Sequence, residues 1–173
     1  MLTIVTACLG NIVKQPDCDA IVNSANPSLR AGSGVCGAIH RAAGPELERS
    51  AMQYAPLSLA QAVATPGFNL PNRLVIHCRG PKYNFDSEPA ANLARCLANI
   101  LRVADGEAVA RIAIPAISMG IYGYPPDEAA PILIGKALEM AKLLEHVEEI
   151  RFVLTSENLL SLFIDSIDKQ SAS

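Results

Sequence analysis

The sequence is poor in aromatic and charged residues. It contains no tryptophan, aromatic residues make up only 5% of its 173 positions, and charged residues make up 18%. Its 14 Lys and Arg against 17 Asp and Glu give a formal net charge of -3. Such a chain lacks the positive field that attracts nucleic acid or an anionic membrane, and the aromatic platforms that stack unpaired bases. We therefore expect neither DNA nor a membrane as a partner, and any bound anion must be held by local geometry.

Metal-ligand spacing is also missing. The five cysteines form an odd set without a C-x-x-C pair, and the three histidines include no H-x-x-x-H pair. These patterns argue against a disulfide framework and against a zinc ribbon. We predict no structural metal and no cofactor. The cysteines are Cys8, Cys18, Cys36, Cys78 and Cys96.

Long apolar runs are absent as well. No stretch approaches the ~18 residues of a membrane span, and the first ten residues lack the basic start of a signal peptide. Together with the cysteine pattern, these features favour a cytoplasmic protein. At the other end of the chain, the polar residues 168–173 are expected to form a short frayed tail.

Hydrophobic residues make up half of the chain, which is enough to bury the core of one domain. Short runs rich in Val and Ile predict buried strands at residues 2–8, 19–23, 74–78, 111–117 and 151–155. Helical spacing predicts helices at residues 37–52, 90–103, 128–145 and 159–167. This alternation predicts one α/β domain over residues 1–167, with a largely parallel sheet and helices on both faces.

Two segments are harder to assign. Residues 54–71 contain Pro56, Pro66 and Pro71, and we expect them to form an irregular surface loop. Pro131 falls inside the helix predicted from residue 128, where a proline costs roughly 3 kcal/mol outside the first turn. The proline therefore favours a later start for that helix.

Two glycine-containing loops follow predicted strands. Residues 31–37 contain Gly32 and Gly34 before a helix, and residues 118–123 contain Gly120 and Gly123. In parallel sheets ligands bind beyond the carboxyl ends of the strands, and glycines let backbone N–H groups and a helix N-terminus approach an anion. Either loop alone is more often a tight turn, but two at neighbouring strand ends predict a clamp for a diphosphate. Neither loop carries a P-loop or Rossmann signature.

Several stretches, in order along most of the chain, resemble the macro domain family in its MacroD-like branch, which includes Appr-1-p processing and O-acetyl-ADP-ribose deacetylase proteins. The resemblance implies a three-layer α/β/α sandwich with a mixed, mostly parallel sheet. It also implies binding of ADP-ribose or an ADP-ribosylated protein, and, in many members, hydrolysis of ADP-ribose esters. The stretches are D-A-I-V-N-S-A-N (19–26), G-V-C-G-A-I-H-R-A-A-G-P (34–45), T-P-G-F-N-L-P (65–71), V-I-H (75–77) with G-P (80–81), and I-P-A-I-S-M-G-I-Y-G-Y-P (114–125).

The resemblance also assigns roles to single residues. Asn26 matches the asparagine that touches the distal ribose in hydrolytic members, and Asn23 supports the loop. Loop capping by the two asparagine side chains is the alternative. Asn11 stands where the family has an aspartate for the adenine amino group, and Phe152 is expected inside the sheet, so we predict weaker adenine binding. The predicted ligand-binding residues are Asn11, Ile12, Asn23, Gly32, Ser33, Gly34, Val35, Ser118, Met119, Gly120, Ile121 and Tyr122.

The catalytic prediction depends on Cys36, which stands where the family's catalytic branch usually has an aspartate. A thiol with a pKa near 8.5 is a poorer base at neutral pH than a carboxylate. A helix dipole that favours the thiolate, and His40 four residues further on, would offer a Cys–His pair. Asn26, Cys36 and His40 are the predicted catalytic residues, and a reader that binds ADP-ribose without turnover is the alternative. The alternative for His40 is a histidine packed and hydrogen-bonded on the inner face of its helix. His77, inside its strand, is expected to be structural.

Overall fold

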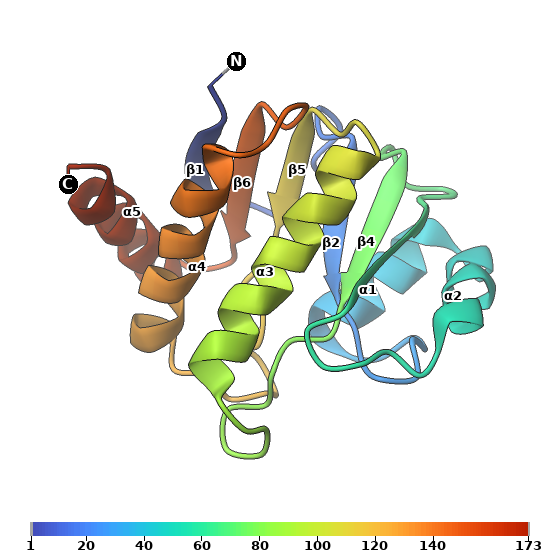
Figure 1. The fold of residues 1–173 in the computed structure, drawn as a ribbon. Helices are drawn as coiled ribbons and strands as arrows, with labels where there is room; N and C mark the ends of the chain where they lie inside the picture. The colour runs from blue at the N-terminus through green and yellow to red at the C-terminus, as the bar shows by residue number, and fades with distance from the viewer. Residues whose placement is uncertain (1, 173) are drawn as a thin grey trace.

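The computed structural model describes residues 2–172, which form one sheet between helical layers (Figure 1). The strands are β1 (Ile4–Leu9), β2 (Ala20–Ser24), β3 (Ala62–Pro66), β4 (Leu74–Cys78), β5 (Arg111–Ile114) and β6 (Glu149–Leu154). The helices are α1 (Gly34–Ala43), α2 (Glu46–Ala51), the 3-10 turn η1 (Met52–Tyr54), α3 (Pro89–Gly106), α4 (Pro126–Ala141) and α5 (Glu157–Ser171).

The sheet has the strand order β1-β6-β5-β2-β4-β3. All neighbouring strands pair in parallel except β3, which runs antiparallel to β4 at the edge. The three-layer α/β/α fold with a mixed, mostly parallel sheet is therefore confirmed. Because β2 and β5 are direct neighbours, the two glycine loops that follow them leave the same edge of the sheet.

Each central strand is buried on both faces. In β2, Ala20 and Val22 belong to the core beneath α3, α4 and α5, whereas Ile21 belongs to the core beneath α1 and α2. Strict alternation of apolar side chains between two cores produces the continuous apolar runs seen in the sequence. Phe152 in β6 is 0% exposed, so the prediction that it lies inside the sheet is confirmed.

Several helix boundaries differ from the sequence prediction. The helix predicted at residues 37–52 is two helices, because Gly44 takes a φ of +89° at the end of α1 and Pro45 follows. The prediction of a later start for α4 was wrong. That helix begins earlier, at Pro126, and keeps Pro131 within it. Residues 168–171, predicted as a polar tail, form the last turn of α5, and Ser173 lies outside the described residues.

The predicted surface loop at residues 54–71 contains a strand, which is a second correction. Residues Ala62–Pro66 form β3, paired with β4 through the register Val63 with His77. Three of its five residues are Ala or Pro, which are uncommon in strands, so the segment carries little β propensity of its own. An edge position tolerates Pro66 because only one side of the strand is paired.

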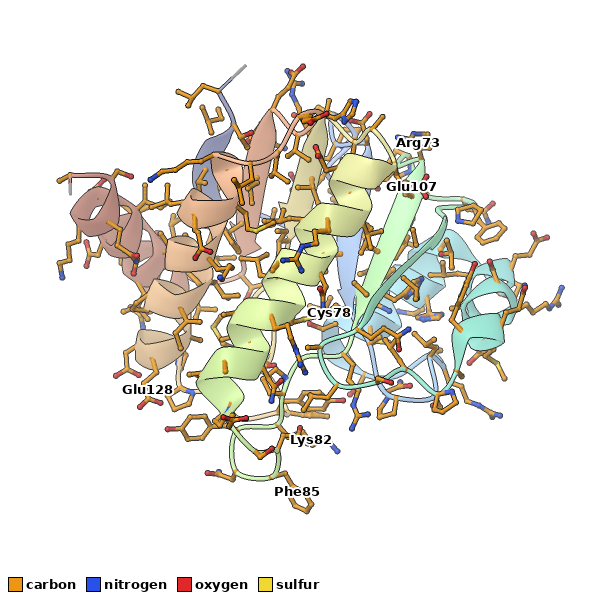
Figure 2. The ribbon with its side chains drawn as sticks, viewed as in Figure 1. Arg73, Cys78, Lys82, Phe85, Glu107 and Glu128 are labelled. Carbon is orange, nitrogen blue, oxygen red and sulfur yellow. A yellow bond between two sulfur atoms is a disulfide. The ribbon has the colours of Figure 1, made fainter. Side chains whose placement is uncertain are left out.

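A third correction concerns the cysteines. The sulfur atoms of Cys78, in β4, and Cys96, in α3, are bonded, although the sequence argued against disulfides. The two residues are 18 positions apart and lie together only because α3 packs against β4 (Figure 2). Spacing in the sequence could not reveal this proximity.

None of the helices within residues 2–172 is long and apolar enough to span a membrane.

Candidate functional site

A cleft of about 270 Å3 opens at the carboxyl ends of β2 and β5. Both glycine loops contribute to it: we call residues 31–37 the first glycine loop and residues 118–123 the second. The lining residues are Ser24, Asn26, Gly32, Ser33, Gly34, Val35, Cys36, Ala116, Ser118, Gly120, Ile121 and Tyr122. The structure therefore brings together ten of the fifteen residues predicted for the site.

The first glycine loop presents the N-terminus of α1 to the cleft. Ser33 caps the helix in an extended conformation without a side-chain hydrogen bond, and Gly34 takes a φ of +58°. The first N–H groups of a helix have no acceptor within it, and they lie at the positive end of the helix dipole. With Gly34 and Val35 lining the cleft, this end of α1 suits an anionic group such as a phosphate.

Close packing holds the first glycine loop in place. A Cβ atom on Gly37 would overlap the carbonyl oxygen of Gly32, so only glycine allows the loop to lie against α1. From α2, the Glu48 carboxylate accepts a hydrogen bond from the N–H of Ala31 at 2.9 Å. The loop is thus fixed from both ends.

The second glycine loop is also held in an unusual conformation. Ser118 takes a φ of +65°, which costs a residue other than glycine about 1 kcal/mol or more, and its carbonyl accepts from Tyr124 N–H at 2.8 Å. Gly80, after β4, packs against this loop, because a Cβ there would overlap Ser118 and lie 2.8 Å from Ile117 Cγ2. Strain of this kind clusters at ligand-binding loops.

Asn26 lines the cleft while also shaping the turn that precedes the first glycine loop. Its Nδ2 donates to Arg30 O at 2.8 Å, and its Oδ1 accepts from Ser28 Oγ at 2.8 Å and from Arg30 N at 3.1 Å. Loop capping, the alternative considered from the sequence, is therefore present. One of the two Nδ2 hydrogens remains for a ligand, because an amide carries two donors.

Cys36 reaches the cleft as a neutral thiol. Its Sγ donates to Arg30 O at 3.5 Å, and burial raises the pKa of the thiol above its ordinary value. The Asn23 amide and the Gly32 backbone favour the thiolate, but they do not offset the cost of burial. The net shift therefore runs against the thiolate that the helix position was expected to favour.

His40 does not join Cys36. Although the two residues are one helical turn apart, His40 lines a separate hollow behind the first glycine loop, with Gly37, Arg41 and Glu48 among its neighbours. Burial lowers the pKa of His40, and its Nε2 has no hydrogen-bond partner among the described residues. The structure therefore supports no Cys–His pair.

Asn23 lies beneath the cleft in a buried chain of hydrogen bonds. Its Nδ2 is 3.0 Å from His77 Nδ1, and His77 Nε2 is 3.0 Å from Thr65 Oγ1. An amide nitrogen only donates, so Nδ1 must accept, and the ring carries its hydrogen on Nε2. Burial, reinforced by nearby His40, lowers the pKa of His77 to about 3. His77 is therefore a neutral structural histidine, and it fixes the orientation of the Asn23 amide.

The neutral His77 predicts a loss of stability in acid. An unfolded histidine takes up a proton near pH 6.5, whereas native His77 stays neutral down to about pH 3. The unfolded chain therefore binds more protons between these values, and His77 should lower the free energy of unfolding by about 1.4 kcal/mol per pH unit as the pH falls. When the free energy of unfolding is measured by urea unfolding between pH 6.5 and 4.5, it should change less with pH in His77→Gln than in the wild type. Equal slopes for both proteins would contradict the prediction.

Two buried hydroxyls in the cleft lack partners, and sequence reasoning missed one of them. Ser24 Oγ and Ser118 Oγ have no hydrogen-bond partner among the described residues, although both residues line the cleft. Buried polar atoms are rarely left unpaired. Both oxygen atoms are inaccessible to solvent, and Ser118 Oγ lies against Gly80, so a ligand in the cleft would reach these hydroxyls only after the side chains rotate. Ser24 and Ala116 were not predicted, although the position of Ser24 at the end of a strand, between Asn23 and Asn26, was a usable signal.

Five predicted residues do not line the cleft. Asn23 lies beneath it and His40 behind the first loop, while Met119 packs against the main core. Asn11 and Ile12 follow β1, which is separated from β5 by β6, and Ile12 is buried. The Asn11 Oδ1 accepts from Val13 N–H at 3.1 Å. An adenine-binding role for Asn11 and Ile12 stays a prediction.

Comparison with known proteins agrees with this geometry, since the family model of the macro domain matches residues 22–133. The chain belongs to the macro domain family. A macro domain-containing protein of Ralstonia nicotianae is 50% identical over 118 residues, 68% of this chain and 69% of the relative. The O-acetyl-ADP-ribose deacetylase of Enterobacter cloacae is 40% identical over 150 residues, 84% of this chain and 83% of that protein.

Solved macro domains share the whole architecture. A mutant macrodomain of Oceanobacillus iheyensis with ADPR superposes with a TM-score of 0.92 at 33% identity, covering 96% of this chain and 93% of that one. Within residues 2–172 of this macro domain, no three His, Cys, Asp or Glu side chains gather closely enough to hold a metal ion.

Proposed function

We propose that this macro domain binds ADP-ribose in the cleft and hydrolyses esters at its distal ribose, as in O-acetyl-ADP-ribose or an ADP-ribosylated carboxylate side chain. The observation that carries the proposal is the cleft itself, where two held glycine loops, with Ser24 and Ser118 among the lining residues, surround a space at the N-terminus of α1. Relatives named O-acetyl-ADP-ribose deacetylase and a solved macrodomain with ADPR support the choice of ligand.

The diphosphate lies between the two glycine loops in this proposal. The N-terminal turn of α1 donates from one side, and the backbone of the second loop donates from the other. The spare Nδ2 hydrogen of Asn26 then orients the distal ribose, so that its ester faces Cys36 and Tyr122. Holding the ester in one position lowers the entropic part of the barrier to attack by water.

The protein supplies no ionised base at the ester. Burial raises the pKa of Cys36 and of Tyr122, and burial lowers the pKa of His40. All three groups are therefore neutral near pH 7, and the phosphate of the substrate is left as the group that activates water. Turnover should be slower than in a macro domain with a carboxylate at position 36, since a general base contributes about 100-fold or more.

This arrangement predicts a rate that does not follow a protein group between pH 6.5 and 8.5. A histidine with a lowered pKa is already neutral above pH 6.5, and a thiol and a phenol with raised pKa values stay protonated up to pH 8.5. After subtraction of the uncatalysed hydrolysis, kcat for O-acetyl-ADP-ribose should vary by less than about twofold across this range. A rise of about tenfold per pH unit would instead show that a protein base acts.

Asn26 provides the first test of the proposal. Asn26→Ala should lower kcat roughly 100-fold, because the distal ribose would no longer be oriented. Ser28→Ala is the matched control: it removes one hydrogen bond of the same turn without changing the lining of the cleft, and it should keep at least half of the activity. Equal losses in both variants would assign Asn26 a role in loop shape alone.

One observation favours the second candidate, a reader of ADP-ribose without turnover. Cys36 is a neutral thiol whose hydrogen is donated to Arg30 O, so it neither attracts nor deprotonates water. A reader would bind ADP-ribose as tightly as the proposed enzyme does, and would release no product. Binding and turnover must therefore be measured on the same preparation.

A further inference from the structure

A further hollow, which we call the outer hollow, has a volume of about 370 Å3 and lies on the outer side of the second glycine loop. It shares Ile121 and Tyr122 with the cleft, so the two hollows adjoin across these residues. Its lining residues are Lys82, Asn84, Phe85, Ile121, Tyr122 and Gly123. The proposed binding of ADP-ribose in the cleft does not require the outer hollow.

The rim of this outer hollow exposes two large apolar side chains. Phe85 is 88% exposed and Ile121 is 79% exposed, in a chain that otherwise has few aromatic residues. Figure 2 shows Phe85 at the tip of the loop between β4 and α3, pointing away from the body of the domain. A single exposed apolar residue is ordinary, but two beside one hollow mark a binding surface.

The loop that carries Phe85 is well held. Its turn is closed by hydrogen bonds from Lys82 N–H to Asp86 Oδ2 at 2.8 Å and from Asp86 N–H to Lys82 O at 2.9 Å. Tyr83 N–H donates to Tyr122 O at 3.0 Å, which joins this loop to the second glycine loop. The outer hollow is therefore a formed shape whose position relative to the cleft is fixed.

The outer hollow contains one positively charged side chain, that of Lys82. Lys82 Nζ is 5.3 Å from the Tyr122 ring centroid and 5.9 Å from that of Phe85, and no described carboxylate forms an ion pair with it. The Asp86 carboxylate of the same loop accepts a hydrogen bond from the Lys82 N–H through Oδ2 and forms no ion pair with the Lys82 ammonium. The ammonium is thus placed between two rings and available to an incoming carboxylate.

We propose that the outer hollow binds the polypeptide that carries the ADP-ribose, specifically an acidic segment flanking the modified side chain. The proposal rests on the proposed function, because a chain ester-linked to the distal ribose leaves the cleft beside Tyr122 and Ile121. An apolar side chain of that segment packs on Phe85 and Ile121, and a flanking carboxylate pairs with Lys82. The outer hollow then distinguishes modified proteins from free nucleotides.

The test compares the affinity of two ligands by calorimetry: free ADP-ribose, and a peptide that carries ADP-ribose through a non-hydrolysable linkage with acidic flanking residues. The wild-type protein should bind the peptide about tenfold more tightly than ADP-ribose. Phe85→Ala and Lys82→Ala should each lower the affinity for the peptide at least about fivefold, which corresponds to about 1 kcal/mol. Neither substitution should change the affinity for ADP-ribose. With a peptide whose flanking residues are neutral, Lys82→Ala should no longer lower the affinity, whereas Phe85→Ala should still do so.

Matched controls and contrary outcomes follow from the same design. Leu143 is 68% exposed and lies between the C-terminus of α4 and the start of β6, at the opposite end of the strands from the outer hollow, so Leu143→Ala should change neither affinity. Equal wild-type affinities for peptide and nucleotide would overturn the proposal, as would variants that weaken both ligands alike. Retained preference for the peptide without any turnover of O-acetyl-ADP-ribose would overturn the hydrolytic function and leave the peptide site standing.

Discussion

Replacing Gly37 with alanine is expected to weaken ADP-ribose binding at least about 100-fold. A methyl group at this position would overlap the carbonyl oxygen of Gly32, which is backbone and cannot rotate away as a side chain can. The first glycine loop would have to move off α1, and the backbone N–H groups that face the diphosphate would lose their positions. Two or three hydrogen bonds to a charged ligand, at about 1.5 kcal/mol or more each, account for the loss.

The measurement is a calorimetric titration with ADP-ribose, accompanied by thermal unfolding. Gly106→Ala is the matched control, because a methyl group there meets nothing within 4 Å and the residue closes α3 far from the cleft. The control should bind like the wild type. If Gly37→Ala kept the wild-type affinity, the first glycine loop would not hold the diphosphate.

Replacing Cys36 with aspartate is expected to have the second-largest effect, an increase in kcat of roughly 100-fold. The new carboxylate would lie in the first turn of α1. Its ordinary pKa of about 4 lies well below that of a thiol, so it would be ionised near pH 7 and would provide the base that the cleft lacks. The reaction to follow is the release of acetate from O-acetyl-ADP-ribose.

Cys36→Ala provides the comparison for this prediction. Because the thiol is neutral and donates to Arg30 O, its removal should change kcat by less than about threefold. Activity lost in Cys36→Ala would instead assign the thiol a direct part in the reaction. Activity in Cys36→Asp alone, with none in the wild type, would identify the natural protein as a reader.

The strand at residues 19–23 and the loops beyond it could be predicted because their determinants are local. Ala20, Ile21 and Val22 are buried on both faces, so the apolar run itself marks a central strand. The glycines of both loops are likewise visible in the sequence, and their convergence follows from the parallel pairing of β2 with β5.

Other features depend on contacts between distant parts of the chain. Strand β3 exists because β4 offers it a partner, and the bond between Cys78 and Cys96 exists because α3 packs on β4. The spacing of Cys36 and His40 correctly places both on one helical face. It could not show that the first glycine loop separates the cleft from the hollow behind it, which leaves His40 on the other side.

The hydrogen bonds of Asn26 and Cys36, and the protonation state of the Cys36 thiol, could not be predicted from the sequence either. Both side chains bond to Arg30 O, and this shared acceptor is formed by the turn that Asn26 itself closes. The direction of the Cys36 pKa shift depends on burial, which outweighs the hydrogen bonds from Asn23 and the Gly32 backbone that favour the thiolate. A motif shows which residues meet, but the state of a buried thiol depends on the packing around it.

The most direct test of the proposed function follows O-acetyl-ADP-ribose in the presence of a substoichiometric amount of the wild-type protein. Chromatography should show ADP-ribose accumulating to many equivalents of the protein, at a rate clearly above that of the uncatalysed reaction. If conversion stays at the uncatalysed rate while calorimetry on the same preparation shows ADP-ribose bound, the protein is a reader and the hydrolytic function is wrong.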